Sequence, residues 1–157
     1  MRLVLLRHAI AEEVCADDPG NDFARRLTLE GRRKLKRVLR CYARLGSLPP
    51  RIYTSPLVRA RQTASQAGRF LDLPVLLSEA LVPGGDAFGW LRQCDEEHLM
   101  VVGHEPDLSF LAARFLGLQF PCFSIKKSGM VGLEGDPGRG RLLWLVTPKW
   151  SGTQFRT

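Results

Sequence analysis

Short apolar runs alternate along the chain with longer amphipathic segments. Four of these runs are too short to cross a membrane and suit strands buried on both faces of a parallel sheet. They cover residues 3–6, 52–54, 75–77 and 99–102. The segments between them carry apolar residues at helical spacing, as at Leu35, Val38, Leu39 and Tyr42. Strands that alternate with helices predict an α/β fold with a mostly parallel sheet.

Local signals predict where the helices begin and end. Thr28 is a suitable cap for the first helix, which Gly46 ends. Ser55 is expected to cap a second helix, with Pro56 at its first position. Asp86 is expected to cap a short helix that runs to about Cys94.

The last helix and the end of the chain complete the predicted architecture. Pro106 and Asp107 are expected to open a helix that ends near Phe115. Residues 124–135 and 141–148 flank a Pro-Gly turn and predict an antiparallel hairpin along the sheet edge. The whole pattern predicts a three-layer α/β/α sandwich, and the tail from residue 149 to 157 is expected to be loosely held.

Length and composition predict one domain over residues 1–157. The chain shows no leader pattern and no apolar run of membrane-spanning length, so we expect a cytoplasmic protein without membrane contact. Four cysteines are scattered, without the close pairs that suggest zinc or a redox dithiol. They are Cys15, Cys41, Cys94 and Cys122.

The net charge of +7 comes largely from basic residues within 25–40. These residues recur on the polar side of the predicted helix, which favours a solvated face over a nucleic-acid groove. The interleaved aromatic residues or glycine-rich signature of a nucleic-acid site are missing, so no nucleic-acid partner is predicted. A basic surface would attract a phosphorylated partner.

Candidate chemistry lies where the first predicted strand ends, at Arg7 and His8. Ligands of open α/β sheets collect at the carboxyl ends of strands. Arginine offers a permanent fork of donors to a phosphate, and a neutral histidine can attack phosphorus.

Two later segments predict partners for Arg7 and His8. The helix after Ser55 would point its N-terminal N–H groups towards the strand ends, and Arg59 lies one turn inside it. His104 follows the strand at 99–102. Because these strand ends share one edge of a parallel sheet, we expect two histidines and two arginines to converge on one pocket.

Three motifs together resemble the histidine phosphatase superfamily, which has the phosphoglycerate-mutase-like fold. They are LVLLRHA (3–9), SPLVRARQTA (55–64) and VVGHEP (101–106). An R-x-L-T-x-x-G element at 25–31 and an L-x-P-x-G-D element at 81–86 resemble the small SixA-type phosphohistidine phosphatases. The resemblance spans residues 1 to about 147. The superfamily's usual glycine after Arg-His is replaced by Ala9.

The resemblance implies a role for each matched residue. His8 would be the nucleophile that becomes phosphorylated, and Arg7 and Arg59 would bind the phosphoryl oxygens. His104 would complete the charge-stabilising pocket. Ser55 would add a donor and Arg25 a further substrate contact. The residues show no convincing metal-ligand spacing, and no metal or other cofactor is expected.

Three carboxylates are candidates for a general acid: Glu79, Asp86 and Glu105. Glu105 directly follows His104. Glu79 and Asp86 can equally be a turn contact and a helix cap. A phosphohistidine leaves as an imidazole that is readily protonated, so a dedicated acid is less necessary than for phosphoserine.

The leading hypothesis is a phosphatase that hydrolyses phosphohistidine in a protein, such as a phosphorelay domain. The alternatives are a phosphatase of a small phosphorylated metabolite and a non-catalytic phosphate-binding regulatory module. Short segments between the predicted strands leave little material for a lid, which favours an open site and a protein substrate. The presence of both histidines and both arginines favours an enzyme.

Overall fold

A six-stranded sheet forms the centre of the computed structural model, which describes residues 1–14 and 19–149. Its strands are β1 (Arg2–Arg7), β2 (Ile52–Thr54), β3 (Val75–Leu77), β4 (His98–Gly103), β5 (Met130–Glu134) and β6 (Arg141–Val146). They lie in the order β3-β2-β4-β1-β5-β6. The first four are parallel, and β5 and β6 are added antiparallel at one side. The predicted mixed sheet with an antiparallel edge hairpin is confirmed.

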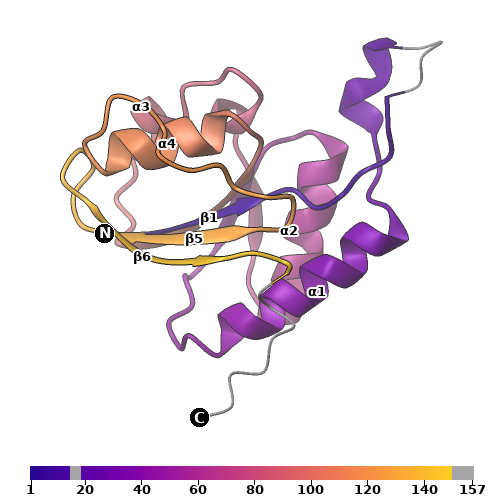
Figure 1. Cartoon of the computed structure of the whole chain (residues 1–157), viewed down its shortest axis with the longest axis horizontal. Helices are drawn as coiled ribbons and strands as arrows, with labels where there is room; N and C mark the ends of the chain where they lie inside the picture. The colour runs from indigo at the N-terminus through magenta and orange to yellow at the C-terminus, as the bar shows by residue number, and fades with distance from the viewer. Residues whose placement is uncertain (15–18, 150–157) are drawn as a thin grey trace.

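Helices cover both faces of this sheet. They are η1 (Pro19–Ala24), α1 (Leu29–Ala43), α2 (Val58–Leu71), η2 (Glu79–Leu81), α3 (Ala87–Leu91) and α4 (Asp107–Phe115), where η marks a 3₁₀ helix. Figure 1 shows α1 and α2 on one side of the sheet and α3 and α4 on the other. This arrangement is the predicted three-layer sandwich.

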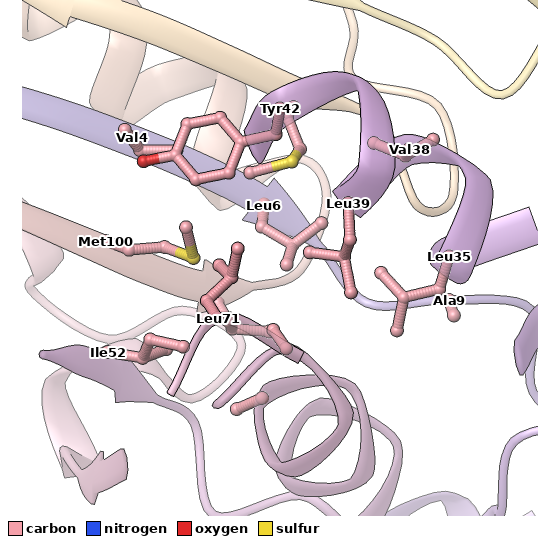
Figure 2. Packing of buried hydrophobic residues seen from close by; sticks show 14 of the residues in the cluster. Val4, Leu6, Ala9, Leu35, Val38, Leu39, Tyr42, Ile52, Leu71 and Met100 are labelled. Atoms are coloured by element: carbon pink, nitrogen blue, oxygen red, sulfur yellow. The ribbon is translucent and has the colours of Figure 1, made fainter. Parts of the chain in front are cut away.

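Strand β1 contributes to the core on both faces. Leu6 packs with Leu39 of α1 on one face, as Figure 2 shows, whereas Leu5 belongs to the cluster under α3 and α4. Successive side chains of a strand point to opposite faces, so only an unbroken apolar run can serve both layers. Each such leucine stabilises the fold by roughly 1.5–3 kcal/mol through burial. The same packing fixes the strand end that carries Arg7.

The predicted start of the second helix is wrong. Helix α2 begins at Val58, and Leu57 occupies its cap position without a side-chain hydrogen bond. The Ser55 N–H instead donates to the Val102 carbonyl at 3.1 Å and so continues the strand pairing. Ser55 therefore does not cap a helix, and Pro56 lies outside it.

Other boundaries also differ from prediction. Helix η1 forms before α1, where the sequence predicts no element, and its Asp22 contacts Arg59. Helix α3 ends at Leu91 rather than near Cys94. Strand β5 begins only at Met130, because a tight turn precedes it: the Gly129 N–H donates to the Lys126 carbonyl at 2.6 Å, and Ser128 has a φ of 63°.

One histidine and the cysteines lie outside the motifs. His98 is the first residue of β4 and pairs with Arg2. Cys41, Cys94 and Cys122 are free thiols, and Cys15 lies outside the described residues. No helix in the described ranges is both long and apolar enough to cross a membrane. The predicted loose tail lies outside these ranges except for Lys149.

Candidate active site

The register of two neighbouring parallel strands brings the two motif histidines together. Arg7 at the end of β1 pairs with Gly103 at the end of β4, and the His8 N–H donates to the Gly103 carbonyl at 3.0 Å. His8 and His104 follow directly. Their ring centroids lie 5.2 Å apart, and the residues are only 5% and 3% exposed. The two imidazoles therefore form the centre of a buried site.

One nitrogen of His8 is held by the backbone. Its Nδ1 lies 2.8 Å from the Ala9 carbonyl oxygen. A carbonyl can only accept, so Nδ1 carries the proton and Nε2 keeps a free lone pair in the neutral ring. This hydrogen bond selects Nε2 as the nucleophilic atom.

His104 is held by Ser55. The His104 Nε2 lies 2.9 Å from the Ser55 Oγ. The Ser55 oxygen accepts the Leu57 N–H at 3.3 Å, so its own proton is available to donate to His104 Nε2. Both residues are buried. The serine expected to act through a helix cap thus acts through the ring of the second histidine.

Helix α2 supplies Arg59 as its second residue, with 4% of the residue exposed. Its Nη1 donates to the Asp22 carbonyl at 2.7 Å and its Nη2 to the Asp22 carboxylate at 3.0 Å. Arg25 holds the other oxygen of that carboxylate, with Nε 2.9 Å away. Arg25 therefore reaches the site through Asp22.

Arg7 is positioned by the segment before β5. Its Nη1 donates to the Ile125 carbonyl at 2.8 Å. The Ile125 N–H donates to the Glu105 carboxylate at 3.1 Å, and Ser109 Oγ lies 2.6 and 2.7 Å from the two oxygens of that carboxylate. Glu105 is thus engaged in holding this segment beside Arg7.

We name Arg7, His8, Arg59 and His104 the His–Arg cluster. Burial is the main cause that lowers the pKa of His8 to about 4, and Arg59 and Arg7 lower it further against the opposing hydrogen bond to Ala9. Burial, followed by Arg59, lowers the pKa of His104 to about 3. Both rings are therefore neutral at pH 7.

Several buried polar atoms around the cluster have no hydrogen-bond partner within the described ranges. They are Arg7 Nε, Arg59 Nε, His104 Nδ1 and Ser128 Oγ. Buried polar groups are normally paired, because an unpaired one costs about 1–3 kcal/mol. The two Nε atoms and the Ser128 hydroxyl are donors, and His104 Nδ1 is a donor in the tautomer in which Ser55 donates to Nε2. An oxyanion bound among them would accept from them.

Three groups beside the cluster are not among the predicted site residues. Lys127 lies close enough for its charge to lower the pKa of His8. Ser128 donates its N–H to the His8 carbonyl at 3.3 Å. Thr63 accepts the Ala9 N–H at 3.0 Å and donates to the Arg59 carbonyl at 2.7 Å. The two lysines before Ser128 are the available signal in the sequence, but they fall within the segment that is predicted to form the edge hairpin.

The other two carboxylates that are candidates for a general acid, Asp86 and Glu79, lie away from the His–Arg cluster. Asp86 caps α3 by accepting the Gly89 N–H at 2.9 Å, and it is largely exposed. Glu79 is exposed in η2, and no hydrogen bond or ion pair in the described part of the chain joins it to the cluster. The structure thus brings Glu105 near Arg7 but neither of the other two. No group of three or more metal-binding side chains occurs within residues 1–14 and 19–149.

Comparison with known proteins identifies the family. The model of the histidine phosphatase superfamily, branch 1, matches residues 3–82. An uncharacterised protein of Picosynechococcus sp. is 35% identical over 164 residues, which cover 96% of this chain and 98% of that protein. The chain belongs to the histidine phosphatase superfamily, whose members are phosphatases with a histidine nucleophile.

Solved structures share the fold. The protein histidine phosphatase SixA complexed with tungstate matches with a TM-score of 0.84 at 24% identity, covering 95% of this chain and 98% of that one. A putative SixA from Agrobacterium tumefaciens matches at 0.79 and 23% identity, covering 94% and 97%. A mycobacterial glucosyl-3-phosphoglycerate phosphatase in complex with VO3 matches at 0.68 and 18% identity, covering 91% and 98%. The same architecture therefore occurs in phosphatases described for protein and for metabolite substrates.

Proposed function

We propose that this protein hydrolyses phosphohistidine in a phosphorylated protein, through a phosphorylated His8 intermediate. The observation that carries the proposal is the His–Arg cluster, with a neutral nucleophilic nitrogen beside two guanidinium groups. The match to SixA over nearly the full length of both chains supports a protein substrate. Hydrolysis of a small phosphorylated metabolite is the alternative, supported by the likeness to the mycobacterial enzyme.

In the first step, His8 Nε2 donates its lone pair to phosphorus. The bond between phosphorus and the substrate imidazole nitrogen breaks, and that nitrogen keeps the electron pair and takes a proton from water. Arg7 and Arg59 stabilise the charge on the equatorial phosphoryl oxygens, as fixed cations do in phosphoryl transfer. His104 Nδ1 and Ser128 Oγ are available as further donors.

In the second step, water attacks the phosphorus of phospho-His8. The bond to Nε2 breaks, inorganic phosphate leaves, and His8 regains its lone pair while the proton lost by water goes to solvent or phosphate. The same cations serve both steps, because both transition states carry the charge on the same oxygens. We propose that these cations do the work without a metal ion.

Glu105 acts in this proposal as a positioning residue. Both of its carboxylate oxygens accept hydrogen bonds from Ser109, and one also accepts the Ile125 N–H. The substrate imidazole needs no strong acid as it leaves. We propose that residues 1–157 form one catalytic domain, since both core clusters share β1 and β4.

The test compares two substrates of the purified protein. We expect faster turnover of a phosphohistidine-carrying phosphotransfer domain than of p-nitrophenyl phosphate, with both activities lost in His8→Ala. Faster turnover of the ester would favour the metabolite alternative. Retention of activity by His8→Ala would exclude His8 as the nucleophile.

A further inference from the structure

Helix α2 presents a polar stripe along a groove of about 990 Å³. The stripe follows helical spacing and consists of Arg61, Gln62, Ser65, Gln66 and Arg69, with Val58 lining the groove at the start of the helix. The groove is also lined by Arg26 before α1, Arg32 of α1 and Leu77 of β3. This surface lies outside the His–Arg cluster and is not used by the proposed reaction.

All charged side chains that line the groove are positive. Arg26, Arg32, Arg61 and Arg69 line it, and its lining includes no aspartate or glutamate. Arg32 bonds to Gln62 Oε1 at 3.1 Å. The other three arginines are exposed, and their guanidinium groups make no hydrogen bond or ion pair within the described part of the chain. Three guanidinium groups are therefore free to bind an anionic partner.

One end of the groove adjoins the active site. Thr54 and Val58 line the groove, and the residues that follow them, Ser55 and Arg59, belong to the site. From Val58 to Arg69 the helix rises about 16 Å, at 1.5 Å per residue. An extended peptide advances about 3.3 Å per residue, so this length holds roughly five residues.

We propose that the groove binds an acidic segment of the phosphorylated protein substrate while its phosphohistidine lies at the His–Arg cluster. This inference rests on the proposed function and adds a second contact to it. Carboxylates of the segment would pair with Arg26, Arg61 and Arg69. Gln62 Nε2 and Gln66 Oε1 would bond to its backbone, since the other amide atoms of these two side chains are already hydrogen-bonded within the protein. The lining has no aromatic side chain on which bases could stack, which favours an acidic polypeptide over a nucleic acid.

The experiment uses two synthetic peptides, each with one chemically phosphorylated histidine. In one peptide the histidine is flanked on both sides by five glutamates or aspartates, and in the other by glutamines and serines. We expect wild-type kcat/KM to be about tenfold higher for the acidic peptide, because several surface ion pairs of up to about 1 kcal/mol each contribute. The variant Arg61→Gln/Arg69→Gln should reduce this ratio to about twofold or less.

A matched variant separates the groove from general attraction by the basic surface. Arg33→Gln/Arg37→Gln removes the same charge from exposed positions of α1 outside the groove, and it should keep the wild-type ratio. An unchanged ratio in the groove variant, or equal losses in both variants, would overturn the proposal.

Binding of an unphosphorylated, fluorescein-labelled acidic peptide tests the groove without turnover. We expect weaker binding in Arg61→Gln/Arg69→Gln than in the α1 variant. Tighter binding of a single-stranded oligothymidylate of equal charge would overturn the choice of a polypeptide. If wild type cleaves p-nitrophenyl phosphate but neither phosphohistidine peptide, the proposed function is wrong. Weaker binding of the labelled peptide by Arg61→Gln/Arg69→Gln would then still show that the groove binds an acidic polypeptide.

Discussion

Asp22 and Arg59 are joined by two hydrogen bonds, one from Nη1 to the Asp22 carbonyl and one from Nη2 to its carboxylate. Burial raises the pKa of Asp22, but the Arg59 and Arg25 guanidinium groups outweigh this effect and lower it. The carboxylate is therefore ionised at neutral pH. A negatively charged group of the protein itself occupies a guanidinium that would bind the phosphoryl group.

This contact predicts that Asp22→Asn increases the affinity for an oxyanion. Removing the charge frees Arg59, while the backbone hydrogen bond from Nη1 keeps it in place. We expect the Kd for tungstate to fall about three- to tenfold, as for loss of a partly exposed ion pair. Isothermal titration at constant ionic strength measures the change. Asp136→Asn, a control with the same change of charge at the opposite edge of the sheet, should leave Kd unaltered, and weaker binding by Asp22→Asn would refute the competition.

Thr63 is expected to position both His8 and Arg59. Thr63→Val keeps the shape of the side chain but removes the partner of the Ala9 N–H and the donor to the Arg59 carbonyl. We expect a loss of about 1–3 kcal/mol in the free energy of unfolding. We also expect kcat to fall about tenfold or more, since small displacements of reacting groups are costly. Urea unfolding and steady-state kinetics measure the two effects. Thr63→Ser should restore most of both, and failure of this rescue would argue against a role of the hydroxyl.

Glu105→Gln distinguishes positioning from acid catalysis. A positioning residue predicts the same fractional loss of kcat for a phosphohistidine peptide and for p-nitrophenyl and phenyl phosphates. A general acid predicts a loss that increases with the pKa of the leaving group. We expect the first pattern, together with lower stability, because the amide cannot accept all the hydrogen bonds of the carboxylate. A loss confined to phenyl phosphate would identify Glu105 as the acid.

The lowered pKa of His8 predicts a dependence of stability on pH. Unfolded His8 binds a proton below about pH 6.5, whereas burial delays protonation in the folded protein to about pH 4. Stability from this residue is therefore present above pH 6.5 and declines as pH falls towards 4. Between pH 7 and pH 5 the loss is about 2 kcal/mol. Urea unfolding of His8→Gln should show a pH dependence reduced by this amount, whereas an unchanged dependence would show that His8 is not protonated on unfolding in this range.

The strand and helix pattern could be predicted because each buried element has its own periodicity. The run at Leu3–Leu6 and the spacing of Leu35 and Leu39 both reflect the layer that they contact. The start of α2 could not be predicted from local preference. Ser55 is a favourable cap in isolation, but its hydroxyl is bonded to His104, 49 residues away. A tertiary contact of this kind leaves no local signal.

Some residues of the candidate site could be predicted from the sequence, whereas others depend on tertiary contacts. Arg7, His8 and His104 could be placed together because parallel strand ends share one edge of the sheet. The contribution of Asp22 could not be predicted, because it depends on η1, which forms in a segment for which the sequence predicts no helix. Lys127 could not be predicted as part of the site, because its segment is held there by the hydrogen bonds of Ile125 with Arg7 and Glu105.

Trapping of the phosphorylated protein tests the central claim most directly. The enzyme is mixed with a phosphohistidine substrate, quenched at alkaline pH within milliseconds and examined by peptide mass spectrometry and phosphorus NMR. We predict a phosphoryl group on Nε2 of His8, because Nδ1 is bonded to the Ala9 carbonyl. A phosphoryl group on another residue, or full turnover with no phosphoenzyme at any quench time, would contradict it.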